Sequence, residues 1–234
     1  MKRSYLLLIA AVVAITTDVS AQFVQTTPIR QTSTTRETAT SSSTTSLGSY
    51  QVNVGYNVAN INWSSNQSGN EDALPIKHGV TIGFNGATGI DPSSSLLMDF
   101  GYNFSVFFGT YEESGYDTEV MMGSINVPIR LKYPLSVGSA VISPYCGLNF
   151  RFNLAGWWDT SIDGLGSVNM DLFDEDDMGD TVFRRFQTGF NYGVEIAFGT
   201  MSIGISHVSD FSKIVDSDLS GKFGVTTISL ARHF

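Results

Sequence analysis

The stretch that decides the fold is Met121 to Leu154, MMGSINVPIRLKYPLSVGSAVISPYCGLNFRFNL. It contains two runs of alternating side chains, which meet at a short turn from Pro134 to Ser139. Because successive side chains of a strand point to opposite faces, each run predicts a strand with one apolar and one polar face. Each run spans about a dozen residues, whereas a strand of a soluble protein usually has about five or six. The fold therefore depends on which face points inward.

Apolar and polar residues separate along both runs. In the first run the apolar face carries Met121, Ile125, Val127, Ile129, Leu131 and Tyr133, and the polar face carries Ser124, Asn126, Pro128, Arg130 and Lys132. In the second run the apolar face carries Ile142, Cys146, Leu148, Phe150, Phe152 and Leu154, and the polar face carries Ser143, Tyr145, Gly147, Asn149, Arg151 and Asn153. The basic residues of this hairpin therefore all belong to its polar faces.

The same alternation recurs from residue 50 to the end of the chain. It predicts eight strands, at residues 50–61, 77–88, 96–109, 121–133, 142–154, 183–199, 201–209 and 223–234. The second, fourth and sixth connections are short, whereas the others are long or acidic. Among these we expect an acidic loop over residues 111–117 and a long loop over residues 157–181. The pattern predicts an all-β fold, an eight-stranded antiparallel up-and-down meander.

The composition of the polar faces indicates that they point inward. Gly, Ser, Asn, Gln and Thr dominate them, whereas a surface in contact with water normally carries many more Lys and Glu side chains. The opposite faces carry continuous Phe, Tyr, Val, Ile and Leu. This is the pattern of a transmembrane β-barrel, which is apolar toward lipid and polar inside, and the strands are long enough to cross a membrane. The alternative is a soluble eight-stranded barrel with its apolar face as the core.

Acidic residues concentrate in the odd-numbered connections, which lie at one rim of such a barrel. Barrels of the bacterial outer membrane have short turns on the periplasmic side and longer loops outside the cell. We therefore expect periplasmic termini and acidic extracellular loops.

The N-terminal region has the pattern of a targeting segment followed by a disordered segment. Lys2 and Arg3 precede the apolar run Leu6 to Ile15, and small residues end at Ala21, which predicts a cleaved signal peptide over residues 1–21. The apolar run is too short for a membrane-spanning anchor. More than half of residues 22–48 are Ser or Thr, so this segment is expected to be disordered. Residues 49–234 form the predicted barrel domain.

Charge and cysteine content exclude several classes of function. The net charge of −9 disfavours a nucleic-acid partner, which requires a basic surface. Cys146 is the only cysteine, so the chain has no intramolecular disulfide and no multi-cysteine metal site. No cofactor is expected.

Several strands resemble those of the PorT-like outer-membrane β-barrel proteins. Residues 125–133, INVPIRLKY, resemble the L-x-I-P-L-x-L-K-Y strand of that family, and residues 143–148, SPYCGL, resemble its K-P-Y-x-G-x-G strand. Residues 191–196 resemble a later x-x-G-x-x-x-G strand of the family, with Gly193 at the first Gly of that pattern and no clear counterpart of the second. Residues 228–234 resemble the family's terminal strand, which ends in an aromatic residue. The resemblance covers residues 48–234. It implies a small barrel of a Gram-negative outer membrane, with a role in envelope structure or support of a secretion system.

Six charged residues are predicted to point into the lumen. They are Asp99, Arg130, Lys132, Arg151, Arg185 and Glu195. A closed eight-stranded barrel is filled by side chains, and charges at membrane depth must pair because isolated burial is costly. We expect an ion-pair network that plugs the lumen, and a gate or small pore is the alternative.

One acidic loop has the composition of a cation site. It contains Asp171, Asp174, Glu175, Asp176, Asp177 and Asp180, whose carboxylates are ligands suited to Ca²⁺. The spacing does not fit an EF-hand, so a solvated loop without metal is favoured.

An enzymatic alternative rests on His207 and Ser209. Such a pair resembles the lipid A deacylase barrels, in which His activates Ser against a lipid ester, with Asp216 or Asp218 as the third member. The residues that follow Ser in that family are replaced by Asp210 and Phe211, which disfavours the activity.

The favoured function is a non-enzymatic outer-membrane barrel that contacts other molecules through its acidic loops. Its expected partners are outer-membrane lipid and lipopolysaccharide, the barrel assembly machinery, which would read the terminal Phe234, and envelope proteins.

Overall fold

The computed structural model describes residues 49–63, 75–90, 95–113, 115–173, 183–214 and 221–234. The strands in these ranges are β1 (Ser49–Trp63), β2 (His78–Gly89), β3 (Leu97–Glu113), β4 (Tyr116–Lys132), β5 (Leu135–Val137), β6 (Ala140–Ile162), β7 (Gly166–Asp171), β8 (Phe186–Phe198), β9 (Met201–Asp210) and β10 (Gly221–His233). The predicted signal peptide and the Ser/Thr-rich segment lie outside the described residues. None of the described segments is a helix that could cross a membrane.

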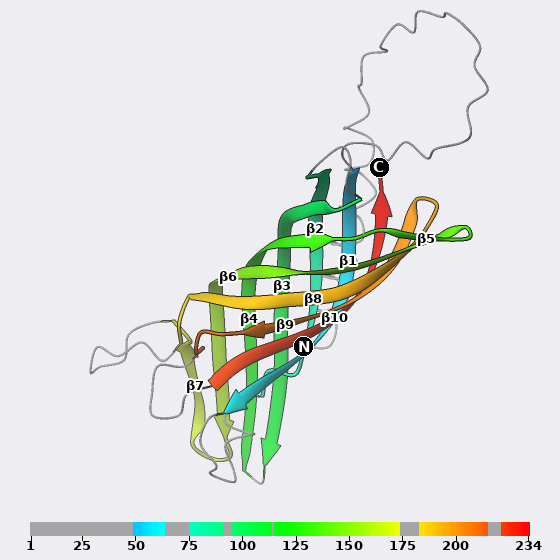
Figure 1. The fold of residues 1–234 in the computed structure, drawn as a ribbon. Coiled ribbons are helices and arrows are strands. Elements are labelled where there is room, and N and C mark those ends of the chain that lie inside the picture. The colour runs from blue at the N-terminus through cyan, green and yellow to red at the C-terminus, as the bar shows by residue number, and fades with distance from the viewer. Residues whose placement is uncertain (1–48, 64–74, 91–94, 114, 174–182, 215–220) are drawn as a thin grey trace, which may run out of the picture. The chain divides into compact units, whose positions relative to one another are not determined.

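Eight long strands form a closed antiparallel barrel (Figure 1). Each strand pairs with its neighbours along the chain, in the order β1, β2, β3, β4, β6, β8, β9, β10. The first and last strands close the ring through a continuous register from Gln51–His233 to Trp63–Gly221. The predicted all-β, eight-stranded meander is thus confirmed.

Two short strands extend the barrel at opposite ends (Figure 1). At the short-turn end, β5 pairs with the start of β6. At the long-loop end, β6 continues past the barrel and pairs with both β4 and β7. The loops predicted at residues 111–117 and 157–181 are therefore wrong in part. Residues 111–113 and 116–117 belong to β3 and β4, around Gly115 with its positive φ of 86°, and residues 157–162 belong to β6.

The apolar face of each barrel strand points outward. Tyr56, Ile228 and Ile205 lie in register on neighbouring strands and are 45%, 56% and 49% exposed. Polar residues of the same barrel, such as Asn57 and Gln187, are 1% and 0% exposed because they point into the lumen. The predicted assignment of the two faces agrees with this arrangement.

Two irregularities interrupt the ladders on either side of β4. Between β3 and β4 the register runs from Phe100–Ile129 to Asn103–Asn126, without pairs for Val127 and Pro128. Proline has no N–H to donate, which accounts for the gap. Between β4 and β6 the register shifts at Gly123 and Ser124, where Leu154 is the extra residue of a β-bulge.

Candidate functional site in the barrel lumen

Five ionisable residues gather in the lumen at the short-turn end, and we call them the ion-pair cluster: Asp99, Arg130, Lys132, Glu195 and His233. The Arg130 Nη2 atom lies 2.6 Å from Asp99 Oδ1, and the Lys132 Nζ atom lies 2.9 Å from Glu195 Oε1. Lys132 Nζ is also 4.0 Å from Asp99 Oδ2, which joins the two pairs. His233 Nε2 lies 3.3 Å from Glu195 Oε1 and 2.9 Å from Ser202 Oγ. The cluster spans β3, β4, β8 and β10.

Tyr145 packs beside this cluster and helps to fill the lumen. The guanidinium carbon of Arg130 lies 4.6 Å from the centre of the Tyr145 ring, a cation–π distance. A Cβ atom on Gly193 would stand 2.7 Å from the Tyr145 hydroxyl oxygen. Gly193 is therefore required for the ring to reach across to β8.

The centre of the lumen holds a network of neutral polar side chains, which the charged Arg151 joins at one end. Arg151 Nε donates to Asn126 Oδ1 over 3.1 Å, and Asn126 Nδ2 donates to Ser105 Oγ over 3.2 Å. Ser105 Oγ in turn lies 2.9 Å from Thr81 Oγ1. A cavity of about 80 Å³ lies among these residues, with Glu195 among its lining side chains. At about 30 Å³ per water molecule, such a space suits a few bound waters rather than an open channel.

Arg151 and Asp210 form a second buried pair toward the long-loop end. Arg151 Nη1 lies 2.5 Å from Asp210 Oδ2, and the two side chains are 1% and 0% exposed. Arg151 Nη1 also donates to Gln187 Oε1 over 3.3 Å. The Arg151 guanidinium carbon lies 4.6 Å from the centre of the Phe223 ring. Arg151 thus links the polar network to the apolar residues above it.

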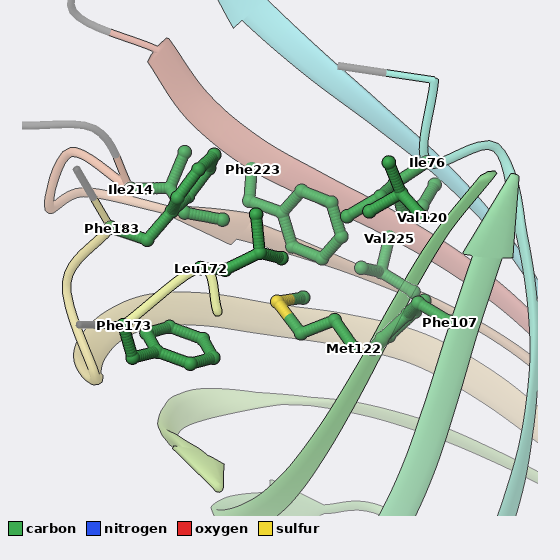
Figure 2. Close-up of a cluster of buried hydrophobic side chains, with 11 residues drawn as sticks. Ile76, Phe107, Val120, Met122, Leu172, Phe173, Phe183, Ile214, Phe223 and Val225 are labelled. Carbon is green, nitrogen blue, oxygen red and sulfur yellow. The ribbon is translucent and has the colours of Figure 1, made fainter. Parts of the chain in front are cut away.

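Buried apolar side chains close the lumen at the long-loop end, and we call them the apolar plug (Figure 2). Its strand members are Ala59, Phe107, Val120, Met122, Phe223 and Val225, and its members from connecting segments are Ile76, Leu172, Phe173, Phe183 and Ile214. The rings of Phe107 and Phe223 meet edge to face, with centroids 5.3 Å apart. Met122 and Ile214 are both 0% exposed. The plug and the ion-pair cluster together leave a small central cavity between them.

The structure brings four of the six predicted lumen residues into one cluster, namely Asp99, Arg130, Lys132 and Glu195. Arg151 points into the lumen but pairs with Asp210 instead. The sequence reasoning assigned Asp210 to a loop, and it overlooked His233. Asp210 shares the parity of Ser202, Gly204 and Val208, which are buried in β9, so the alternation of β9 was the signal that could have identified it.

The structure corrects the prediction for Arg185. It was predicted to point into the lumen, but its side chain is exposed and takes no part in the ion-pair cluster. β8 begins at Phe186, so the strand alternation does not extend to Arg185. Its Nη1 atom donates to the carbonyl oxygen of Leu154 over 3.0 Å, and its guanidinium carbon lies 4.9 Å from the Phe173 ring centre. The bulge at Leu154 frees this carbonyl for Arg185.

The residues of the enzymatic alternative lie on the outer face of β9. His207 Nδ1 lies 2.9 Å from Thr226 Oγ1, and the His207 ring packs against Tyr192 with centroids 5.5 Å apart. Ser209 is exposed. Thr226, rather than Ser209, is the hydrogen-bond partner of His207, so the geometry gives no support to a His–Ser nucleophile. Asp216 and Asp218 lie outside the described residues.

The possible cation loop is described only at Asp171. Its Oδ1 atom accepts a hydrogen bond from the Phe173 amide over 2.8 Å, as in an Asx turn. Asp174, Glu175, Asp176, Asp177 and Asp180 lie outside the described residues. Within the described ranges, no three His, Cys, Asp or Glu side chains converge as metal ligands do.

The terminal Phe234 is exposed beside the end of β10. Its amide donates to the carbonyl oxygen of Tyr50 over 2.9 Å, so the ladder between the first and last strands reaches the final residue. The Arg232 guanidinium carbon lies 5.5 Å from the centre of its ring.

Comparisons with known proteins yield similar folds but no family. No protein-family profile matches the chain, and no curated protein sequence matches it. Neisserial surface protein A is 13% identical with a TM-score of 0.45, over 79% of this chain and 97% of that one. Ail, the attachment invasion locus protein of Yersinia pestis, is 15% identical with a TM-score of 0.41, over 80% and 99%. A major outer membrane protein from Thermus thermophilus is 11% identical with a TM-score of 0.38, over 80% and 99%. These values are too low to assign the chain to a family.

Proposed function

We propose that this chain is a non-enzymatic outer-membrane β-barrel protein of a Gram-negative bacterium with a lumen closed by its own side chains. The observation that carries the proposal is the inversion of the two faces. The row Tyr56, Ile228 and Ile205 is about half exposed on the outer wall, whereas Arg151 and Asn57 are each 1% exposed inside. A barrel in water places its apolar residues inside, whereas a barrel in lipid places them outside.

The proposed orientation has the short turns and both termini in the periplasm. The signal peptide predicted over residues 1–21 supports export, and the strand motifs that resemble PorT-like barrels support the outer membrane as the destination. The extension built from β3, β4, β6 and β7 then stands outside the cell. It carries Glu112, Asp117, Glu119, Asp159 and Asp163. We propose that this acidic surface contacts other envelope or extracellular molecules, with envelope structure or secretion-system support as the role.

The membrane assignment is tested by placing a charge on the outer wall. Ile228 lies near the middle of β10, so Ile228→Arg should lower the free energy of unfolding from lipid vesicles by about 2–4 kcal/mol. Phe198→Arg is the matched control, because Phe198 is 55% exposed at the short-turn end of β8. There the expected cost is only about 0–1 kcal/mol. Urea titration of the vesicle-embedded barrel measures both. Equal costs for the two variants would overturn the membrane assignment.

The closed lumen is tested by electrical recording in planar bilayers. The ion-pair cluster, the Arg151–Asp210 pair and the apolar plug lie one after another along the lumen, so we expect no steady single-channel conductance from the folded protein. Large, steady conductance steps from correctly folded protein would favour the small pore instead.

A further inference from the structure

β7 is an edge strand of the extension at the long-loop end. It pairs with β6 from Trp157–Asp171 to Ile162–Gly166, and no other described strand pairs with it (Figure 1). All six of its residues are exposed. Native proteins usually protect such an edge with Lys, Pro, a bulge or a covering segment. β7 has neither Lys nor Pro, and its register with β6 is continuous. Within the described residues, one row of its backbone N–H and C=O groups therefore has no ladder partner.

One face of the extension is acidic. Glu112 opposes Asp117 in the register of β3 and β4, and Glu119 opposes Asp159 in the register of β4 and β6. Opposed residues share a face, and so do residues two apart on a strand, so these four carboxylates lie together. Asp171 joins them, because it lies two residues beyond the β7 partner of Asp159. Like charges directly opposite each other destabilise a sheet, so this face carries an uncompensated repulsion.

The extension has no cation of its own to offset this charge. Residues 109–123 and 155–173 contain no Lys, Arg or His. None of the five carboxylates forms an ion pair with a described residue. A basic partner would relieve the repulsion, whereas a second copy of this chain would bring the same acidic face and add to it. Charge complementarity therefore selects a basic partner.

The opposite face of β7 is apolar. Val168 and Met170 share that face, and each is 54% exposed. A strand added at the β7 edge would place every second side chain next to Val168 and Met170, and the others next to Asn169 and Asp171. The edge therefore fits a strand in which apolar and basic residues alternate.

We propose that β7 binds an extended basic segment of another polypeptide by strand addition. Main-chain hydrogen bonds to the β7 edge supply the affinity, and the two faces of the extension select the alternating side chains. The proposal rests on the proposed outer-membrane function, because in that orientation the edge stands outside the cell, where such a partner can reach it.

β5 provides an internal control. It is a second edge strand, and within the described residues it pairs only with β6, at the short-turn end. Its three residues are exposed, as those of β7 are. However, residues 133–142 contain no acidic residue. β5 thus presents an edge without the acidic face.

The probe is a capped peptide of about eight residues in which Val and Lys alternate. Its binding to the barrel in phosphatidylcholine nanodiscs, which carry no net charge, is measured by fluorescence anisotropy. The peptide should bind, and it should slow amide hydrogen exchange in β7 but not in β5. The same peptide with Glu in place of Lys should not bind. The Lys peptide with methylated backbone amides should bind at least about tenfold more weakly, because it keeps the charges but cannot donate ladder hydrogen bonds.

The charge requirement is tested with Asp117→Asn/Asp159→Asn. This variant should fold, because it relieves like-charge repulsion, and it should bind the Lys peptide about fivefold more weakly. Ser136→Lys/Ser139→Lys is the matched control, because it changes the net charge by the same amount at the short-turn end, where both serines are exposed. It should leave binding unchanged. Equal weakening by the two variants would mean that net charge, rather than the acidic face, attracts the peptide, and would overturn the site.

Three further results would overturn strand addition: equal binding of the Lys and Glu peptides, equal binding of the methylated and unmethylated peptides, or equal protection of β5 and β7. Slow exchange at β7 without peptide would show that a second copy or another segment of the chain already occupies the edge, which also overturns it. If the peptide does not bind while Ile228→Arg costs far more than Phe198→Arg, only the β7 site is overturned. Equal costs for those two variants would overturn the proposed function, on which the site depends.

Discussion

The two ends of the lumen are closed by opposite chemistry. At the short-turn end, the ion-pair cluster uses side chains from the regular barrel strands. At the long-loop end, the apolar plug combines strand residues such as Met122 with residues from connecting segments such as Ile76 and Ile214. Ion pairs need fixed distances and angles, which rigid strands supply, whereas apolar packing is not directional and accepts contributions from irregular chain. This barrel therefore places its directional contacts where the backbone is regular.

The largest expected effect is at Arg151, which lies between the two ends. Arg151→Met leaves the Asp210 carboxylate unpaired at 0% exposure, and removal of one partner from a buried pair costs about 3–5 kcal/mol. Urea titration with tryptophan fluorescence measures the loss. Arg151→Met/Asp210→Leu is the control, and it should recover most of the stability because no charge is left buried. If the double variant is as unstable as the single one, the ion pair itself stabilises the fold, and the loss in Arg151→Met is not due to the unpaired Asp210 carboxylate.

An intermediate effect is expected at Met122 in the apolar plug. Met122→Ala removes a fully buried side chain and leaves a cavity, so the free energy of unfolding should fall by about 3 kcal/mol. Met121→Ala is the neighbouring control, because Met121 is on the opposite face of β4, and it should cost about 0.5 kcal/mol. Equal losses, measured by the same titration, would mean that the plug packs loosely.

The smallest effect is expected in the ion-pair cluster, at Lys132. Lys132→Met leaves Glu195 with His233 as a remaining partner, and the Glu195 side chain is 10% exposed rather than fully buried. The expected loss is about 1–3 kcal/mol, and it should be less than that of Arg151→Met. Lys77→Met, which removes an exposed cation, should be nearly neutral. A loss at Lys132 as large as that at Arg151 would show that His233 does not compensate, and the contrast between the two sites would disappear.

The period-two alternation was enough to predict the barrel strands and the inward residues Asp99, Arg130, Lys132 and Glu195. It could do so because each lies well inside a strand whose two faces differ in composition. It failed at Arg185, which precedes β8, and at the ends of β3, β4 and β6, where polar residues pair through their backbones beyond the barrel. Thr118 and Thr160 are such a pair in the register of β4 and β6, and their hydroxyl oxygens also lie 3.1 Å apart.

The apolar plug was beyond prediction for a different reason. Phe107 and Met122 occupy inward positions near the ends of the predicted strands at residues 96–109 and 121–133, where the alternation does not show that the interior changes from polar to apolar. Ile76 and Ile214 lie in connections, so neither a period nor a register describes them, whereas Phe183 belonged to the predicted strand at residues 183–199 but precedes β8 in the structure. These residues form a core only because several connecting segments pack together over the long-loop end of the lumen, which the sequence alone does not show.

The closing seam between β1 and β10 has a consequence for the order of events as the chain folds. Every other seam of the ring joins strands that follow one another along the chain, whereas this seam brings Gln51 to His233. The entropic cost of joining distant segments makes such a contact late relative to hairpins. The plug needs Ala59 from β1 and Phe223 from β10 on the same side of the lumen, and Glu195 needs His233 from β10. The ion-pair cluster and the apolar plug therefore become complete only after β1 has paired with β10. Until then the barrel is an open sheet, and the side chains that will line the lumen stay in contact with water.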